Sequence, residues 1–434
     1  MRFRSRISFH GLSWLLLFAV MPVQQAAAQM AGISPEVIGL PIDQILISGN
    51  EDTQERWVLK WAGIRRGQLL SIPLLKRARQ ELRDTDLFRT VSFQAERYED
   101  GELTLHIMLE ERRSWLLLPR LNRNADGDVK FGLRLRMYNL NGADQTLEML
   151  AQQEEEHTGD DSEEFRMRYK LPLFSRPYDL EWRLSQVIEN TEEEGFDNVE
   201  TIDRFTMKVS RDWHIDRLPL PLTVGTGITF EERGLDQPYP ESIEAREAGH
   251  YNRLQLQLTF DDLHSERYRR YGSYYSVTIA RGFEWLDSDY DSDIFEFEAL
   301  GFRPLNRYDN INYRLVVAAS NNSPFDYLNY SIGGGSSIRG LESVDDRGDA
   351  RVFTNLEYIF AYKKHPGVAH SLFVDIGNIY DDFDDIDLSD LRYTIGTGFR
   401  WKIESFVKTD LFLDFGYDIE DKAGKLYGGT SLPF

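Results

Sequence analysis

Arg253-Leu254-Gln255-Leu256-Gln257-Leu258-Thr259-Phe260 is the stretch that decides the fold, because polar and apolar residues alternate along its whole length. Successive side chains of a β-strand point to opposite faces, so this stretch predicts a strand with one apolar and one polar face. The same alternation recurs from Ser114 to Phe434, and no helical periodicity persists there. Most of the chain is therefore predicted to be β-structure.

Strands that alternate in this way fit two architectures. In a soluble sandwich the apolar faces pack on each other, whereas in a membrane barrel they face lipid and the polar faces line the interior. Three observations favour the barrel: an N-terminal secretion signal, strand lengths near the roughly 9–11 residues that a tilted span needs, and aromatic residues near strand ends. These aromatic residues are Trp182, Tyr274, Tyr275, Phe283, Trp285 and Trp401.

The alternating segments number about 16, an even count that suits a closed transmembrane antiparallel barrel with a wide polar interior. They begin near residues 115, 128, 145, 164, 178, 203, 222, 251, 272, 294, 311, 351, 371, 393, 407 and 425. Residues 114–434 are therefore predicted to form a 16-stranded transmembrane β-barrel.

Residues 1–28 have the three parts of a secretory signal peptide. A positive start, a short apolar core and a small-residue cleavage site follow one another at Arg2–Arg6, Leu12–Val23 and Ala26–Ala28. The apolar core is too short to span a bilayer, so we expect a cleaved signal and not an anchor. Residues 29–39 are predicted to be a linker.

Residues 40–113 are predicted to form a small unit with the order β-α-α-β-β. A short strand around Ile45 and Ile47 ends at the turn signal Gly49-Asn50, and Asp52 or Thr53 can cap the first helix. A second helix is expected after Ser71, and two strands at 90–98 and 102–110 follow.

Composition excludes several functions. The formal net charge is −22 and no basic stripe stands out, which argues against nucleic-acid binding. The chain has no cysteine, and its 8 histidines are scattered, so we predict no enzyme, no catalytic residue, no cofactor and no metal site. Acidic connections such as 153–164 and 189–200 offer carboxylates for divalent cations, but without ligand spacing a solvated acidic loop is the better interpretation.

One long connection, from about Asn322 to Asp349, contains Ile332-Gly333-Gly334-Gly335-Ser336-Ser337-Ile338-Arg339-Gly340-Leu341-Glu342. Loops longer than about 12–15 residues are usually functional or disordered. The glycines lack the Gly-Lys-Ser/Thr ending of a phosphate-binding loop and the second glycine of a nucleophile elbow. A flexible surface loop and a functional loop both remain open at this point.

Two blocks of sequence give the chain a resemblance to the BamA/TamA and two-partner-secretion superfamily, of the bacterial surface antigen type. The first is similar to a POTRA domain: Ile45-x-Ile47-x-Gly49-Asn50, then Leu82-x-x-Thr85-x-Leu87-Phe88-x-x-Val91. The second, Gly334-Gly335-Ser336-Ser337-Ile338-Arg339-Gly340, is similar to the arginine-glycine motif on the loop that folds back into the barrel of this family. Leu341 stands where the family usually has an aromatic residue, and only one POTRA-like unit is present.

The resemblance implies partners for Arg339, which in the family meets acidic residues on the inner wall of the next two strands. Glu357 and Asp375 take the polar phase of the segments that follow, so both should face the interior. An arginine between two carboxylates makes charge-assisted hydrogen bonds. We therefore expect Arg339, Gly340, Glu357 and Asp375 to latch the loop inside the barrel; the alternative is ordinary interior charges. The loop glycines are Gly333, Gly334 and Gly335.

The first and last strands of a closed barrel must meet, and here both are poor strand formers. The first contains Pro119, and the last contains Gly428, Gly429 and Pro433. Proline removes a hydrogen-bond donor and glycine weakens a strand, so the sequence predicts a weak seam. The lateral gate of the family lies at this junction; the alternative is simple fraying of strand ends.

The resemblance implies an outer-membrane barrel of a Gram-negative-type bacterium, with the POTRA-like unit in the periplasm, which inserts or exports client polypeptides. Its expected partners are outer-membrane lipid, an unfolded or extended client polypeptide held at a sheet edge, and an accessory protein or a second copy of the chain. The alternative is a passive pore or structural barrel without client handling.

Overall fold

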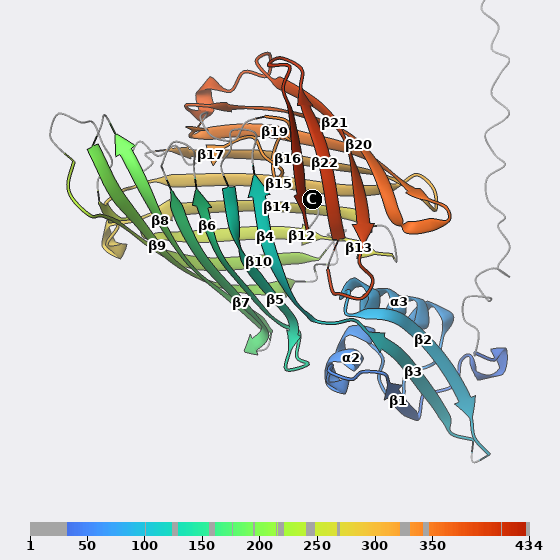
Figure 1. Cartoon of the computed structure of the whole chain (residues 1–434). Helices are drawn as coiled ribbons and strands as arrows, with labels where there is room; N and C mark the ends of the chain where they lie inside the picture. Colours follow the sequence, from blue (N-terminus) through green and yellow to red (C-terminus); the bar gives the residue numbers. More distant parts are fainter. Residues whose placement is uncertain are drawn as a thin grey trace, which may run out of the picture.

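The computed structural model of the chain describes residues 33–430, apart from residues 100, 124–128, 156–160, 176, 194–195, 214, 216–220, 240–247, 267–269, 322–329, 342–346 and 409. The predicted signal peptide, Pro433 and parts of the two acidic connections lie outside the described residues. Two units are present, a small N-terminal one and a large antiparallel sheet (Figure 1). The prediction of a mainly β chain is confirmed.

The N-terminal unit has the predicted order of strand, helix, helix, strand and strand. Its elements are η1 (Pro35–Val37), β1 (Gln44–Ser48), α2 (Glu55–Ala62), α3 (Ile72–Asp84), β2 (Phe88–Arg97) and β3 (Leu103–Glu111). The sheet order is β1-β3-β2, with β1 parallel and β2 antiparallel to β3. The linker predicted at residues 29–39 is wrong in its described part, because Val37 is buried in the core of this unit.

Local sequence explains where the two helices begin. Ser71 caps α3, its hydroxyl accepting from the Leu74 amide at 3.3 Å, as expected for a serine before a helix. The cap predicted for α2 at Asp52 or Thr53 is wrong, because the N-cap is Gln54. The amides of Asp52 and Thr53 instead donate to the Glu111 carboxylate of β3, which draws these residues out of the helix.

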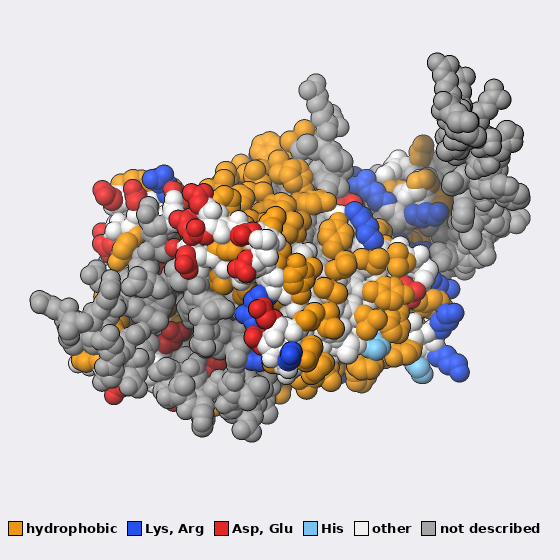
Figure 2. Space-filling model, turned by 90° about the horizontal axis from the view of Figure 1, so that it is seen from above, with side chains coloured by type: hydrophobic (Ala, Val, Ile, Leu, Met, Phe, Trp, Pro, Cys, Tyr) orange, Lys and Arg blue, Asp and Glu red, His pale blue; other side chains and the backbone are white. Residues whose placement is uncertain are grey.

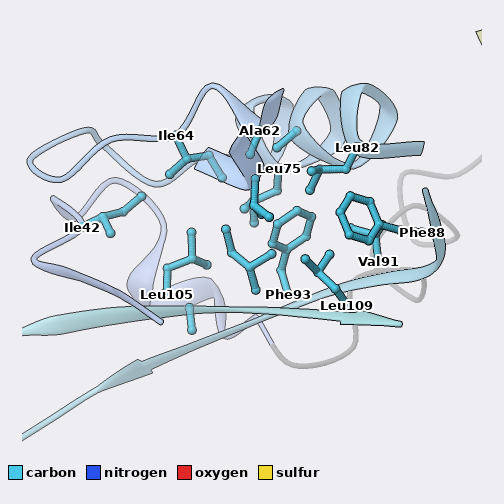
Figure 3. Close-up of a cluster of buried hydrophobic side chains, with 14 of the residues drawn as sticks. Ile42, Ala62, Ile64, Leu75, Leu82, Phe88, Val91, Phe93, Leu105 and Leu109 are labelled. Atoms are coloured by element: carbon cyan, nitrogen blue, oxygen red, sulfur yellow. The ribbon is translucent and has the colours of Figure 1, made fainter. Parts of the chain in front are cut away.

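Figure 3 shows the core of this unit, where the apolar stripe of α3 meets the inner face of β2 and β3. Leu75 and Leu82 of α3 are fully buried against Phe93 and Leu105. The spacing of the two leucines puts them on one helix face, and alternation puts Phe93 and Leu105 on one sheet face. The unit therefore has its own hydrophobic core.

The large sheet begins at Trp115, shortly after the end of β3 at Glu111. In chain order its strands are β4 (Trp115–Arg123), β5 (Val129–Leu140), β6 (Gln145–Glu155), β7 (Ser162–Ser175), β8 (Tyr178–Glu193), β9 (Phe196–Trp213), β10 (Leu222–Leu235), β11 (Gly249–His250), β12 (Arg253–Asp261), β13 (His264–Ser265), β14 (Arg270–Gly282), β15 (Asp293–Pro304), β16 (Asp309–Asn321), β19 (Ala350–Tyr362), β20 (His365–Tyr380), β21 (Arg392–Lys402), β22 (Asp410–Asp418) and β23 (Gly424–Gly429). Short 3-10 helices, η2 (Glu284–Leu286) and η3 (Phe383–Asp385), lie in two of the connections.

Neighbours in sequence are neighbours in this sheet, and all of its registered pairings are antiparallel. The two-residue segments β11 and β13 flank β12, which itself pairs directly with β10 and β14. The strand order is circular, with β23 next to β4. Among the described residues, β4 is also registered with β5, and β23 with β22, so each of these two end strands has a defined register with its other neighbour.

The two faces of this sheet differ as the alternation predicts. Large apolar side chains on the outer face remain exposed, among them Met207 at 41%, Leu256 at 44% and Ile279 at 51%. Figure 2 shows such side chains spread over the outside, with carboxylates gathered toward one end. Because these side chains are exposed, no second layer of the described chain covers them, and a soluble sandwich is excluded for this face.

No helix among the described residues is long and apolar enough to cross a membrane.

The N-terminal unit is docked on three connections between strands at one end of the large sheet (Figure 1). These connections join β5 to β6, β12 to β14 and β21 to β22. Each connection makes a hydrogen bond to the unit: Asn139 Nδ2 to Thr53 Oγ1 at 2.7 Å, the Ser265 amide to Asp84 at 2.7 Å, and the Lys408 amide to Asp86 at 2.7 Å. The unit is therefore held at one edge of the sheet by several separate contacts.

A further contact of the N-terminal unit with the connection between β12 and β14 depends on pH. His264 Nδ1 lies 2.8 Å from Asp84 of α3, and its Nε2 lies 3.3 Å from Asp262. Burial alone would lower the pKa of His264, but the hydrogen bond and charge of Asp84, with the charge of Asp262, outweigh it and raise the pKa. The charged contact is therefore complete below about pH 6.5, the ordinary pKa of histidine, and is lost as pH rises through the raised pKa.

We expect amides at the end of α3 to exchange with deuterium faster at high pH than the chemical rate alone explains. The same comparison on a His264→Gln variant is the control, since this side chain does not titrate. An equal pH response in the variant and the parent would contradict the assignment to His264.

Candidate functional site

The glycine-rich connection folds into the interior of the large sheet. Two short segments of it pair as β17 (Tyr330–Ser331) and β18 (Arg347–Gly348), and residues 332–341 turn inward. Ile332, Ile338 and Leu341 pack with Val316 and Phe353 of the sheet in one buried cluster. The alternative of a flexible surface loop is therefore wrong for residues 330–341, which we call the interior loop.

Arg339 is the centre of the site, with an exposed fraction of 1%. Its Nε and Nη2 donate to the two oxygens of Asp375 on β20, at 2.8 and 2.9 Å. Its backbone amide donates to the same carboxylate at 3.0 Å. A bidentate pair fixes the guanidinium in one plane, and the third bond fixes the backbone beneath it.

The guanidinium also reaches carboxylates on two other strands. Arg339 Nη1 lies 3.4 Å from Glu357 of β19 and 3.1 Å from Asp414 of β22. A second buried arginine, Arg400 of β21, bonds to both of these carboxylates. Three carboxylates and two guanidiniums thus form one buried network, in which every charge faces an opposite charge.

The structure thus brings Arg339 together with Glu357 and Asp375, while sequence reasoning missed Asp414 and Arg400. Both missed residues sit in the polar phase of their strands, between exposed apolar neighbours such as Phe399 and Leu413. That alternation predicts that they face the interior. Their position along the strands, level with Arg339, depends on the register of β21 with β22, in which Gly398 pairs with Asp414.

An aromatic ring stacks on a face of the Arg339 guanidinium, whose edges make the hydrogen bonds described above. The ring centroid of Phe373 lies 3.5 Å from Arg339 Cζ, which is cation–π geometry. Phe373 shares a strand face with Asp375, two residues on. A Cβ atom at Gly396 would lie 2.1 Å from the Phe373 ring, so the glycine makes room for it.

The backbone of the interior loop is pressed against the wall at Gly340. This residue has φ +109°, which glycine adopts readily, and a Cβ atom at Gly416 of β22 would lie 2.6 Å from the carbonyl of Arg339. The Gly340 amide donates to the Tyr427 hydroxyl of β23 at 3.1 Å, and that hydroxyl lies 3.2 Å from the Leu341 carbonyl. The loop is thus tied to the last strand as well.

The remaining predicted loop residues have more local roles. Gly333 and Gly334 have φ of +106° and +76°, values at which a side chain would be strained. A Cβ atom at Gly335 would lie 3.7 Å from Tyr427, an ordinary contact distance. Leu341, in the position where an aromatic residue was expected, is 1% exposed in the apolar cluster of the loop.

The predicted seam residues lie on β4 and β23. Pro119 is opposite Leu133 of β5, and Gly428 and Gly429 are opposite Leu413 and Phe412 of β22. A hydrogen bond of 3.4 Å from Arg136 of β5 to the carbonyl of Thr430 reaches past β4. Pro433 is outside the described residues.

The arrangement suits holding a loop better than catalysis. Each carboxylate of the network is already bonded to a guanidinium, which fixes the loop to the wall. Within the part of the chain that the structure describes, no group of three or more His, Asp or Glu side chains is placed to hold a metal ion.

Comparison with known proteins gives one family. The Omp85 superfamily domain matches residues 139–424. Outer membrane protein assembly factor BamA of Nitratidesulfovibrio vulgaris is 22% identical over 414 residues, which are 89% of this chain and 50% of that protein. The chain thus spans about half the length of this curated relative.

Three solved structures share the fold at low identity. CdiB from Escherichia coli has a TM-score of 0.60 at 15% identity, covering 91% of this chain and 77% of that one. CdiB from Acinetobacter baumannii has a TM-score of 0.59 at 15% identity, covering 90% and 73%. BamA from Haemophilus ducreyi lacking POTRA domains 1–3 has a TM-score of 0.53 at 16% identity, covering 90% and 84%.

Proposed function

Because the chain belongs to the Omp85 superfamily, in the group that includes BamA and the two-partner-secretion proteins, we propose that it is an outer-membrane barrel that inserts or exports client polypeptides. The observation that carries the proposal is the family match over residues 139–424, which spans the interior loop and all of its partner strands up to Gly424. The exposed apolar side chains of the outer face support a position in a lipid bilayer.

In this proposal the large sheet is a closed 16-stranded barrel. The circular strand order supports closure. The N-terminal unit is the POTRA-like domain, and it lies in the periplasm. Its docking supports this orientation, because the connections that it contacts are shorter than the one between β16 and β19, and outer-membrane barrels have short turns on the periplasmic side and longer loops outside.

Arg339, Gly340, Glu357 and Asp375, with Asp414 and Arg400, form a latch that keeps the interior loop in place. The burial of all its charged groups supports this role, since a displaced loop would leave carboxylates unpaired in the interior. The loop then narrows the passage through the barrel.

The junction of β4 and β23 is the seam through which a client could reach lipid. In the described part of the chain, β23 has six registered pairs with β22, against thirteen between β19 and β20, so the strand on one side of this junction is held by few pairs. A short terminal strand separates from its neighbour more readily than a long one.

Locking this seam tests its role. The chain has no cysteine, so pairs of single cysteines can be placed along 116–118 of β4 and 426–428 of β23, and the pair that crosslinks is kept. We expect the oxidised pair to block client assembly and reduction to restore it. Unchanged assembly in the oxidised protein would remove the seam from the mechanism.

The function itself is tested by comparing the outer-membrane and secreted proteomes with and without this chain. We expect loss of specific β-barrel or secreted proteins, restored by the parent gene. A passive pore or structural barrel would instead change permeability to small solutes and leave the protein inventory intact.

A further inference from the structure

The interior of the sheet contains a second feature, far from the latch in the strand order. A cavity of about 720 Å³ is lined mainly by interior side chains between β5 and β15. We call it the interior cavity. Its lining differs in charge from the chain as a whole.

The lining of the interior cavity is strongly cationic. It has seven arginine or lysine side chains and three glutamates, although the whole chain has a formal net charge of −22. The cations are Arg134, Arg166, Arg168, Arg183, Arg204, Lys208 and Arg253, and the glutamates are Glu148, Glu181 and Glu296. A cavity whose wall carries more positive than negative groups attracts and concentrates anionic ligands.

Two carboxylates at this wall, Glu181 and Glu231, are each shared by several cations, whereas Arg166 pairs with Glu164. Glu181 accepts from Arg168 at 2.8 Å and from Arg183 at 2.7 Å. Behind the wall, Glu231 accepts from Arg204 at 2.8 Å and from Arg253 at 3.0 Å. A third arginine, Arg233, lies 2.9 Å from Glu231. Each of these two carboxylates thus faces two or three positive charges, and the lining of the cavity keeps more cations than glutamates.

The uncharged part of the lining favours a polypeptide. Gln255, Gln257, Thr206, Thr229 and Thr278 offer both hydrogen-bond donors and acceptors. A peptide backbone needs both kinds of partner, whereas a phosphate group needs donors only. The guanidiniums match carboxylate side chains in geometry as well as in charge.

From this combination we infer that the interior cavity binds an acidic stretch of polypeptide, through Arg168, Arg183 and Lys208 in particular. The inference rests on the proposed handling of client polypeptides and adds a preference for segments rich in aspartate and glutamate. The bound stretch would lie against the wall of β7 to β9, opposite the strands that hold the latch.

The test uses the full chain, folded in detergent, and fluorescent peptides of about ten residues, which extend to roughly 33–36 Å. Oligo-glutamate, oligo-glutamine and oligo-lysine are compared by fluorescence anisotropy at two salt concentrations. We expect oligo-glutamate to bind best and its affinity to fall with added salt. Equal binding of oligo-glutamine, or of oligo-lysine, would overturn the inference.

Two matched variants locate the site. Arg183→Gln with Lys208→Gln is expected to weaken oligo-glutamate binding by about tenfold or more, since two charged hydrogen-bond donors are lost. Arg65→Gln with Arg66→Gln removes the same charge from exposed positions of the N-terminal unit and should leave binding unchanged. Heat-dependent mobility on gels shows that both variants are folded. If both variants bind like the parent, the interior cavity is not the site.

The same assay distinguishes an acidic polypeptide from other anionic ligands. Inorganic phosphate and lipopolysaccharide are added as competitors at equal total charge. Displacement of the peptide by either one at lower concentration than by unlabelled oligo-glutamate would overturn the polypeptide assignment. Client depletion in cells is measured separately, so a cavity without peptide preference does not decide the proposed function.

Discussion

Replacing Arg339 with alanine is expected to lower the free energy of unfolding by about 3–5 kcal/mol, the range for removing one partner of a buried charge network. The change leaves Glu357, Asp375 and Asp414, all at most 1% exposed, with Arg400 as the remaining described cation of the network. Asp375 loses both side-chain donors of its bidentate pair. The expected result is a lower temperature for loss of the folded band on gels, with a lower midpoint in urea.

Two variants make this result specific. Arg281→Ala removes another arginine that lies near two aspartates, but Arg281 is 49% exposed and its partners Asp291 and Asp293 are 56% and 45% exposed. A pair of that kind contributes less than about 1 kcal/mol, so the loss should be small. Arg339→Lys keeps the charge and loses the planar fork, so we expect an intermediate value. Equal effects of Arg339→Ala and Arg281→Ala would contradict the latch.

Replacing Gly416 with valine is the second large change, because it acts on the same loop from the wall. The new Cβ atom would lie 2.6 Å from backbone atoms of Arg339, and neither backbone can yield easily. Forcing extra atoms into packed structure costs about 1–3 kcal/mol, which raises the fraction of displaced loop by roughly five- to 150-fold. All polar partners of the latch remain in this variant, so it separates loop position from charge.

The measurement uses a cysteine in place of Ser337, which is 7% exposed in a chain without cysteines. Its rate of reaction with a maleimide should rise when Gly416→Val is added. Gly428→Ala is the matched control, since its Cβ atom would have no neighbour closer than 3.5 Å. A slow reaction in the valine variant would show that the wall can yield.

Alternation along the sequence predicts much of the sheet, because it decides which side chains face inward. It places Glu357 and Asp375 on the inner face, and the structure has both beside Arg339. It does not predict Asp414 or Arg400 as partners, because their height depends on strand register. It also does not predict the contact of Gly340 with Gly416, since nothing in either segment indicates the other.

Strand ends were predicted less well than strand centres. β9 begins at Phe196, not near residue 203, because the hairpin with β8 continues through the pairing of Glu193 with Phe196. β20 begins at His365, not near 371, because a tight turn pairs it with Tyr362. In both cases pairing extends the strand beyond the segment with clear apolar alternation, where the sequence gives no strand signal.

The partners of the interior loop have a consequence for the timing of folding. Arg339 bonds to residues 36 and 75 positions downstream, and Gly340 bonds to one 87 positions downstream. A chain delivered amino terminus first therefore cannot seat the loop until Tyr427 has arrived. Contacts between such distant residues form late in folding. Seating of the loop thus reports that the C-terminal end of the chain has been incorporated.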